Sequence, residues 1–339
     1  MSKRVLISGG LGFLGQHLVH QLIEQNNSGE QDREIIVTDL IESKAIFPED
    51  REHEKIKIKA AVDITSAGSF DHLFQDVDTV FHLAALIRYG RRNKSALRLV
   101  NKIGTQNVFN ACISNNVSKL IHVGSISTFS YDKKGRRLTT ENDMVDWNRE
   151  KSSHYGYSKH CGVQIVRSNI GGKLQVMIGH PGIMLGAGDL KTKPLFKIGS
   201  KLRFIVAPAG GTNFIDVRDV AAGLLHIEKY GKSGEDYLIS HNNITHKELF
   251  HAIAIQAEKK ISVLSISSLA GSLIGPIVSL LEFIMPKKSL LSREGTVKAF
   301  HKRYFSNKKT EEELGWAPNY SLAETIDDAM TWLKAEGHL

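Results

Sequence analysis

A tyrosine and a lysine four residues apart could form an acid–base pair. The segment HYGYSKH carries Tyr155 and Lys159, which share one face if this segment is helical. A tyrosine with a pKa of about 10 is a poor acid–base catalyst at neutral pH. A nearby ammonium favours the phenolate and brings the pKa of the tyrosine towards the working range. We therefore predict proton exchange at Tyr155, assisted by Lys159; Tyr157, two residues from Lys159, is the weaker candidate.

A serine precedes this pair at the end of an apolar run. The segment HVGSIST places Ser125 at the predicted carboxyl edge of a sheet, where a substrate oxygen could lie. A hydroxyl group there can hydrogen-bond a reacting carbonyl or alcohol and orient it towards Tyr155. Ser127 or Thr128 could assist, although all three residues are also ordinary turn residues.

Three glycines follow the first apolar run, in the segment SGGLGFLG. Gly9, Gly12 and Gly15 permit a tight turn, a close approach of the backbone to a pyrophosphate and close packing of helix on strand. The N-terminus of the helix that follows would supply free N–H groups to the phosphates. The segment therefore predicts a dinucleotide-binding turn; the alternative is a glycine-rich turn without a ligand.

A carboxylate ends the second apolar run, in IIVTD. Asp39 lies at about the right distance from the glycines to bind both hydroxyls of an adenosine ribose. A carboxylate there repels the 2′-phosphate of NADP and so favours NAD, while Lys44 and Arg51 nearby keep NADP as the alternative. Asp63, in AVDIT, could accept a hydrogen bond from the adenine amino group or merely cap the next helix.

The first half of the chain alternates short apolar runs with longer helical patterns. This alternation predicts an α/β fold, a Rossmann-type doubly wound parallel sheet with helices on both faces. Right-handed crossovers then place ligands beyond the carboxyl ends of the strands. The expected strands are Arg4–Ser8, Ile35–Asp39, Lys55–Lys59, Thr79–Leu83, Lys119–Val123 and Leu174–Gly179, and the expected helices include Gly12–Asn26, Asn93–Asn115 and Ser153–Ile170.

The pattern changes after about residue 180 to loops rich in Gly and Pro, followed by helices. We expect residues 1–179 to form the NAD-binding domain, and residues 180–213 and 239–339 to form a smaller, mostly helical substrate-binding lobe. Residues 214–238 should return to the first domain, because FIDVRDVAAGLLHI is typical of a strand end that leads into a helix.

The composition is that of an ordinary globular protein. The 339 residues are 41% hydrophobic, with two cysteines, Cys112 and Cys161, outside any CxxC or metal-ligand spacing. We expect two buried thiols and no metal site. The start, MSKRVLISGG, has no long apolar stretch, so we expect no signal peptide and a cytoplasmic location.

A later apolar stretch, Ile261–Met285, is long enough to cross a bilayer. Pro276, Glu282 and several serines interrupt it. We therefore expect a buried or lid-forming pair of helices, with association at a membrane surface as the second option.

The net charge of +8 is concentrated in three basic groups. Each group follows the carboxyl end of an expected strand, so all three should flank the mouth of the site. They would attract an anionic small-molecule substrate or a carrier-linked one, such as a coenzyme A ester, an acyl carrier protein or a nucleotide sugar; the alternative is a solvated basic surface. No nucleic-acid reading module is present. The groups are Arg88, Arg91, Arg92 and Lys94; Lys133, Lys134, Arg136 and Arg137; and Lys191, Lys193, Lys197, Lys201 and Arg203.

Several motifs together resemble the extended short-chain dehydrogenase/reductase family, of the NAD-dependent epimerase/dehydratase type. Besides the glycine turn they are HLAA, NKIGTQNVFNAC, GSIST, YGYSK, HPGIMLGAGD and ELGWAPNYSLAETI, so the resemblance covers essentially the whole chain. It implies that Tyr155 is the general acid/base, that Lys159 lowers its pKa and binds the nicotinamide ribose, and that Ser125 positions the substrate. The cofactor site that it implies comprises Gly9, Gly12, Phe13, Leu14, Gly15, Asp39, Asp63, Ile64, Leu83, Ala84, Ala85, Asn101, Tyr155, Lys159, His180 and Gly182.

Two subgroups of that family compete. The segments HPGIMLGAGD, GGTNFIDVRDVAAG and GEDYLISHNNITHKELFHAIA are similar to bacterial dihydroflavonol reductase-like and 3β-hydroxysteroid dehydrogenase-like proteins, which handle bulky hydrophobic substrates. The alternative is a nucleotide-sugar 4-epimerase or dehydratase with tightly bound NAD, although the asparagine and arginine set typical of such enzymes is not recognisable.

The roles of two residues, and one non-enzymatic function, also need to be considered. His180 stands where an arginine or asparagine is common in the family, and Asn101 could simply brace its helix against the sheet. The protein could instead be a redox sensor that binds NAD without turnover, but the intact set of serine, tyrosine and lysine argues against that function. The resemblance also implies a homodimer.

Overall fold

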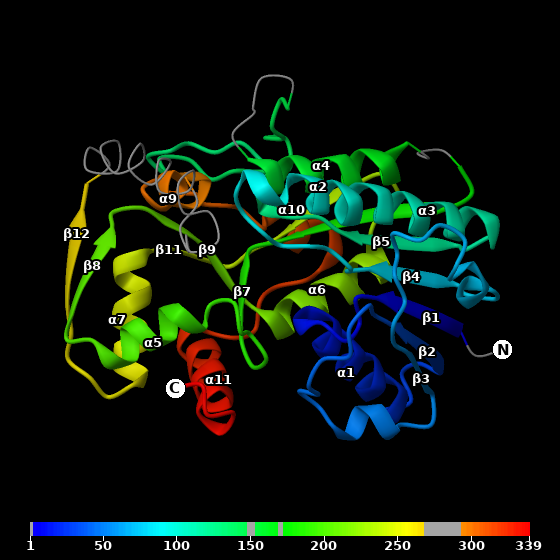
Figure 1. The fold of residues 1–339 in the computed structure, drawn as a ribbon, viewed down its shortest axis with the longest axis horizontal. Coiled ribbons are helices and arrows are strands. Elements are labelled where there is room, and N and C mark those ends of the chain that lie inside the picture. The colour runs from blue at the N-terminus through cyan, green and yellow to red at the C-terminus, as the bar shows by residue number, and fades with distance from the viewer. Residues whose placement is uncertain (1–2, 148–152, 169–171, 268–292) are drawn as a thin grey trace.

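The computed structural model describes residues 3–147, 153–168, 172–267 and 293–339. Its centre is a parallel sheet of seven strands in the order β10-β6-β5-β4-β1-β2-β3 (Figure 1). The expected doubly wound α/β fold is confirmed. The strands are β1 (Lys3–Ser8), β2 (Arg33–Thr38), β3 (Ile56–Lys59), β4 (Thr79–His82), β5 (Lys119–Val123), β6 (Gln175–Pro181) and β10 (Asp236–Ile239).

The strand order reverses beside β1, which pairs with β2 on one side and with β4 on the other. In open α/β sheets ligands bind at such a switch point, outside the carboxyl ends of the strands. The apolar runs of β1 are buried on both sides: Val5 and Ile7 belong to one hydrophobic core, and Leu6 to the core on the opposite face. This explains why β1 reads as a continuous rather than an alternating apolar run.

Helices cover both faces of the central sheet. α1 (Phe13–Asn27) and α6 (Val217–Tyr230) pack beside each other, and their apolar sides share one core with the strands. α3 (Thr105–Ser114) and α4 (His154–Arg167) contribute to the core on the other face. The shorter helical segments among these are η1 (Glu49–Glu52), η2 (Asp71–Phe74), η3 (Arg91–Asn93), α2 (Lys94–Arg98), η4 (Leu99–Gly104) and η5 (Ile126–Thr128).

The second part of the molecule combines helices with two small sheets. One sheet has the order β11-β9-β7 and the other pairs β12 with β8 in parallel. The strands are β7 (Ile183–Leu185), β8 (Phe204–Pro208), β9 (Gly211–Asp216), β11 (Asn242–Thr245) and β12 (Ser262–Ile266). The helices are α5 (Lys193–Lys201), α7 (His246–Gln256), α9 (Arg293–Ala299), α10 (Lys308–Leu314) and α11 (Leu322–Ala335).

Residues 214–238 are divided between these two parts. β9 pairs with β11 and β7 in the small sheet, whereas α6 packs on the central sheet. β10 then joins the edge of the central sheet, where Asp236 to Ile239 pair with Ile178 to Pro181 of β6. The chain therefore passes into the second part of the molecule and then returns to the central sheet to add its last strand, β10.

Two expected helices differ from the structure. The helix expected over Asn93–Asn115 is interrupted by the π-helical turn η4, which divides α2 from α3. The pair of helices expected over Ile261–Met285 is wrong at its start, because Ser262–Ile266 forms β12; residues 268–285 lie outside the described residues. Within the described parts of the chain, no helix is both long and apolar enough to cross a membrane.

Candidate active site

The catalytic candidates Tyr155 and Lys159 lie on the first turns of α4. The helix begins after Ser153, whose hydroxyl accepts a hydrogen bond from the Gly156 N–H at 2.9 Å, as N-cap residues do. Tyr155 and Lys159 are 6% and 4% exposed. The Lys159 ammonium donates to the Val123 carbonyl at 2.6 Å. Since Val123 ends β5, this bond fixes the helix to the carboxyl edge of the sheet.

Burial sets the ionisation of Lys159. Removal from water lowers the pKa of the Lys159 ammonium to about 8. A cation with so little solvation favours a phenolate on the same helix face, because the negative charge replaces part of the lost hydration. Tyr155 and this poorly solvated Lys159 lie one turn apart on α4, the spacing that the predicted acid–base pair calls for.

Ser125 follows β5 in an extended conformation and is held by its neighbours. Its hydroxyl oxygen accepts from the Ser127 N–H at 3.1 Å and from the Ser127 hydroxyl at 2.8 Å, and the Thr128 hydroxyl donates to the Ser125 carbonyl at 2.8 Å. Ser127 and Thr128 thus orient Ser125, which remains half-buried. Because Ser127 donates both bonds to its oxygen, the Ser125 hydroxyl hydrogen can be donated to a substrate.

His180 lies beneath Ser125 and not at the surface of the site. The Ser125 N–H donates to Nδ1 of His180 at 3.1 Å, so Nε2 carries the proton and donates to Asp236 Oδ1 at 2.7 Å. The other Asp236 oxygen pairs with Arg167, the last residue of α4. Burial lowers the pKa of His180 to about 3, which keeps the ring neutral. The ring is fully buried and supports Ser125, and its expected contact with the cofactor stays a prediction.

Replacing His180 with leucine tests this supporting role. The change leaves the Ser125 N–H and the Asp236 carboxylate without their buried partner, and we expect the free energy of unfolding to fall by about 1–3 kcal/mol. Urea unfolding followed by circular dichroism measures the loss. His72→Leu, at an exposed position, is the control and should change stability little. A stable His180→Leu variant would contradict the assignment.

Asn101 also has a structural role. Its amide oxygen accepts from the Leu86 N–H at 2.7 Å, and its amide nitrogen donates to the Leu86 carbonyl and to the Ser158 hydroxyl, both at 2.9 Å. Asn101 sits in the π-helical turn η4 and is 2% exposed. It braces the segment after β4 against α4, as one of the two alternatives proposed, and its place in the cofactor site stays a prediction.

The glycine turn between β1 and α1 has room for a phosphate. Gly9 has a φ of +77°, and a Cβ on it would lie 2.6 Å from the Ala84 nitrogen; a Cβ on Gly15 would lie 2.3 Å from the Gly9 carbonyl oxygen. A Cβ on Gly12 would approach only that same oxygen, at 3.2 Å, and no side chain caps α1. The α1 N-terminus, with no acidic residue in its first turn, therefore fits a pyrophosphate.

The residues around this turn have distinct roles. The Leu83 and Ala84 N–H groups both donate to the Ser8 carbonyl at 2.9 Å, which draws the end of β4, with Ala85 after it, against the turn. Of the first residues of α1, Leu14 is buried in the core and Phe13 lies partly exposed beside it. A Cβ on Gly182 would lie 2.3 Å from the Asn213 amide oxygen, so this glycine allows close packing.

Asp39 and Asp63 lie in the loops that follow β2 and β3. Asp39 accepts from the Leu11 N–H at 3.1 Å and from the Ile41 N–H at 3.4 Å, and burial raises its pKa. Its carboxylate thus belongs to the wall of the glycine turn, where an adenosine ribose would lie. Asp63 accepts from the N–H and hydroxyl of Thr65 at 2.8 Å each, which fixes a turn. The next described helical segment, η2, begins only at Asp71, so Asp63 caps no helix there, and its contact with adenine stays a prediction. Ile64 is buried.

The three basic groups differ in their local pairing. Arg136 pairs with Asp132 at 3.0 Å and Arg137 with Asp143 at 2.7 Å, so half of the second group is locally neutralised. Cys112 is buried as expected, and burial raises the pKa of its thiol, whereas Cys161 is only half-buried. The attraction of an anionic or carrier-linked substrate stays a prediction.

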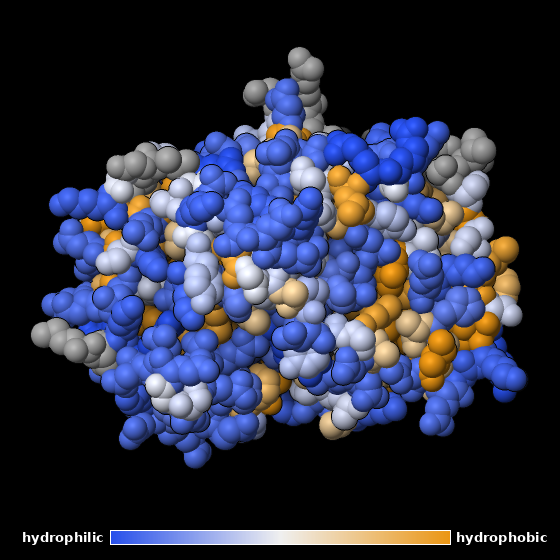
Figure 2. Space-filling view, turned by 180° about the vertical axis from the view of Figure 1, so that it is seen from behind, coloured by the Kyte–Doolittle hydropathy of each residue, from blue (hydrophilic) through white to orange (hydrophobic). Residues whose placement is uncertain are grey.

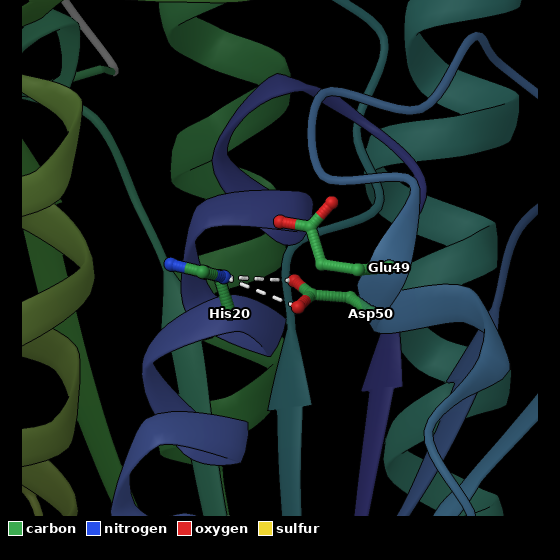
Figure 3. A group of neighbouring side chains, drawn as sticks. All are labelled: His20, Glu49 and Asp50. Atoms are coloured by element: carbon green, nitrogen blue, oxygen red, sulfur yellow. Dashed lines mark hydrogen bonds and ion pairs between the residues drawn. The ribbon is translucent and has the colours of Figure 1, made fainter.

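A histidine and two carboxylates approach one another away from this site. Figure 3 shows His20 of α1 beside Glu49 and Asp50 of η1, and Nδ1 of His20 lies 3.0 and 3.2 Å from the two Asp50 oxygens. Phe47 stacks on the His20 ring at 4.0 Å. These contacts fasten the loop after β2 to α1. Since Asp50 is already engaged by His20 and Glu49 is exposed, we assign no metal site here.

Sequence reasoning missed Asp236, Arg167 and Tyr89. Asp236 and Arg167 reach the site only through the pairing of β10 with β6, and nothing in the local sequence indicates that pairing. Tyr89, half exposed, lies edge-on to Tyr155 with ring centroids 5.6 Å apart. Its position shortly after HLAA was the only feature of the sequence that could have indicated it.

The doubly wound sheet, the open glycine turn at its switch point and the set of Ser125, Tyr155 and Lys159 define an NAD(P)-dependent oxidoreductase of the extended short-chain dehydrogenase/reductase type. The sequence profile of the 3-beta hydroxysteroid dehydrogenase/isomerase family matches residues 6–221. The chain belongs to that family.

Individual proteins are similar over part or all of the chain. A Synechocystis protein named provisionally as a dihydroflavonol 4-reductase is 23% identical, and the match covers 100% of this chain and 97% of that protein. Mouse 3 beta-hydroxysteroid dehydrogenase type 7 is 29% identical over 50% of this chain and 45% of its own. The structure of the dTDP-glucose 4,6-dehydratase DesIV from Streptomyces venezuelae, with NAD bound, has a TM-score of 0.76 at 20% identity and covers 98% of this chain and 97% of its own.

Proposed function

We propose that this enzyme transfers a hydride between NAD(H) and a ketone or secondary alcohol on a bulky hydrophobic substrate. The observation that carries the proposal is the hydrogen bond from Lys159 to the Val123 carbonyl. It holds the turns of α4 that carry Tyr155 and Lys159 at the carboxyl end of β5, which Ser125 follows. The family to which the chain belongs supports a hydrophobic substrate, since its name refers to steroids.

In the reductive direction each of the three side chains has a separate role. Ser125 donates its hydroxyl hydrogen to the substrate carbonyl oxygen and so fixes the orientation of the carbonyl. Tyr155 donates a proton to the same oxygen as negative charge develops on it, and Lys159 stabilises the resulting phenolate. Bound NADH supplies the hydride. In the oxidative direction the Tyr155 phenolate accepts the proton from the alcohol.

The preference for NAD over NADP rests on Asp39. Its carboxylate stands at the end of β2, and a 2′-phosphate there would meet a negative charge. We expect Asp39→Ser to raise kcat/KM for NADPH relative to NADH by about tenfold or more, because the repulsion is removed. Steady-state rates with each coenzyme measure this ratio. Asp63→Ser is the matched control, and an equal shift in both variants would contradict the role of Asp39.

A nucleotide-sugar 4-epimerase or dehydratase is the second candidate. The chain shares its fold with the dehydratase DesIV, and at 20% identity this likeness supports the fold and not the activity. Such an enzyme regenerates its coenzyme in each cycle, whereas a reductase must exchange it at each turnover. We therefore expect freshly purified protein to contain little bound nucleotide and to oxidise NADH with hydrophobic ketones. Stoichiometric bound NAD and no oxidation of NADH by any ketone would favour the second candidate.

A further inference from the structure

The two-stranded sheet of β8 and β12 buries only one of its faces. The strands pair in parallel register, with Val206 opposite Leu264. On the inner face Ile205 and Val263 are buried together with Phe250 of α7. Because side chains alternate along a strand, every second residue of this sheet must point the other way.

The outer face of this sheet is apolar and exposed. Phe204, Val206 and Leu264 are 59%, 52% and 54% exposed, and Leu202, just before β8, is 48% exposed. Figure 2 shows hydrophobic residues gathered at the right edge of the molecule, at the end where β8 and β12 lie. Single exposed apolar residues are common on proteins, but a contiguous row of large ones marks an interaction surface. We call these four residues the apolar row.

Four cations stand at one end of the apolar row. Lys201 and Arg203 precede β8, and Lys259 and Lys260 precede β12; all four are exposed. The segments that precede the two strands lie side by side, because the Ser262 N–H donates to the Arg203 carbonyl at 2.9 Å. Among the described residues none of the four has an ion pair, and the neighbouring exposed acid is Glu258.

We infer that this face docks on the surface of an anionic lipid bilayer, with the apolar row in the interface and the four cations at the headgroups. Apolar side chains flanked by Lys and Arg are what peripheral binding to anionic membranes requires. The inference goes beyond the proposed function. If the proposed hydrophobic substrate is correct, the bilayer is also where that substrate dissolves.

A second copy of the chain fits this face less well. A two-fold interface over the apolar row would bring the same patch of both copies together, and with it two like-charged sets of four cations. Anionic headgroups neutralise that charge instead, which lowers the electrostatic cost of covering the row. The charge therefore favours a bilayer as the occupant.

The test is co-sedimentation of the full chain with vesicles. Phosphatidylcholine vesicles with added phosphatidylglycerol should pellet the protein, whereas pure phosphatidylcholine vesicles should leave most of it in solution. High salt should release it, because the attraction to headgroups is screened. Phe204→Ser combined with Leu264→Thr should weaken the partition at least about tenfold. Lys259→Gln combined with Lys260→Gln should weaken it about tenfold on anionic vesicles.

The matched control lies in another basic group. Leu138, 45% exposed, follows Lys133 and Lys134 within five residues in the sequence, so Leu138→Ser combined with Lys133→Gln removes the same kinds of side chain elsewhere. This control should bind vesicles as the parent does. Thermal unfolding and nucleotide binding verify that every variant is folded, independently of whether a ketone substrate has been found.

Three results would overturn the inference. They are failure to bind anionic vesicles at low salt, equal weakening by the control, and unchanged binding in both variants of the apolar row and its cations. Light scattering adds a further distinction. A dimer that dissociates in Phe204→Ser/Leu264→Thr, without vesicle binding by the parent, would assign the face to contacts between copies.

Discussion

Replacing Tyr155 with phenylalanine is expected to lower kcat by about 10²–10⁴-fold, the range that a single general acid–base group contributes. The substitution removes one oxygen and preserves the ring, which is buried at 6% exposure and packs edge-on against Tyr89. The packing should therefore survive and the proton donor alone should be lost. Turnover with the best ketone found, at saturating NADH, measures the effect.

The experiment has a control on the same helix. Tyr157 lies two residues further along α4 and is 50% exposed, so Tyr157→Phe should retain nearly full activity. Binding of NADH, followed by protein fluorescence or calorimetry, should be similar in both variants. Retained turnover in Tyr155→Phe would refute the assignment of Tyr155 as the acid/base, whatever the substrate.

Replacing Lys159 with methionine should change activity and stability in opposite directions. Turnover should fall by about 10²–10⁴-fold, because Tyr155 loses the cation that favours its phenolate, and the remaining activity should shift to higher pH. The folded protein should nevertheless become more stable at pH 7, by about 1–3 kcal/mol. Burial lowers the pKa of Lys159 from 10.5 to about 8, so carrying the charge inside the protein costs free energy that methionine avoids.

The stability of the two proteins should also depend differently on pH. Between about pH 8 and pH 10.5 the unfolded chain holds a proton on Lys159 that the folded chain has lost. The parent should therefore gain stability as pH rises through this window, and lose that gain as pH falls through about 8. In Lys159→Met the gain disappears. Lys197→Met, at an exposed lysine, is the control, and a Lys159→Met variant less stable than the parent at pH 7 would contradict the account.

Local patterns were sufficient for the first half of the chain. The runs VLI and IIV are buried on both sides of the sheet, and the glycine turn lies where its spacing indicates. The segment with Ser125 and the start of α4 with Tyr155 and Lys159 lie at the same edge of the sheet, where Lys159 donates to the carbonyl of Val123 at the end of β5. Each of these relations joins residues close in sequence or follows from the order of parallel strands, so periodicity and spacing can predict them.

The remaining features depend on contacts distant in sequence. β10 has four residues and becomes a strand by pairing with β6, which brings Asp236 to His180, 56 positions earlier. β12 becomes a strand by pairing with β8, so its apolar residues could not be distinguished from a helix. The π-helical turn at Asn101 follows from the bonds of that amide to Leu86 and Ser158. No local preference encodes such partners.

The late return of the chain to the central sheet has a consequence during synthesis. β10 closes the exposed edge of β6 only after residues 182–235 have been made, so the nascent protein carries an open strand edge for that interval. Chains truncated before Asp236 should consequently aggregate or bind chaperones on the ribosome. The same delay means that His180 acquires its carboxylate partner, and Ser125 its final support, only after Asp236 has been translated.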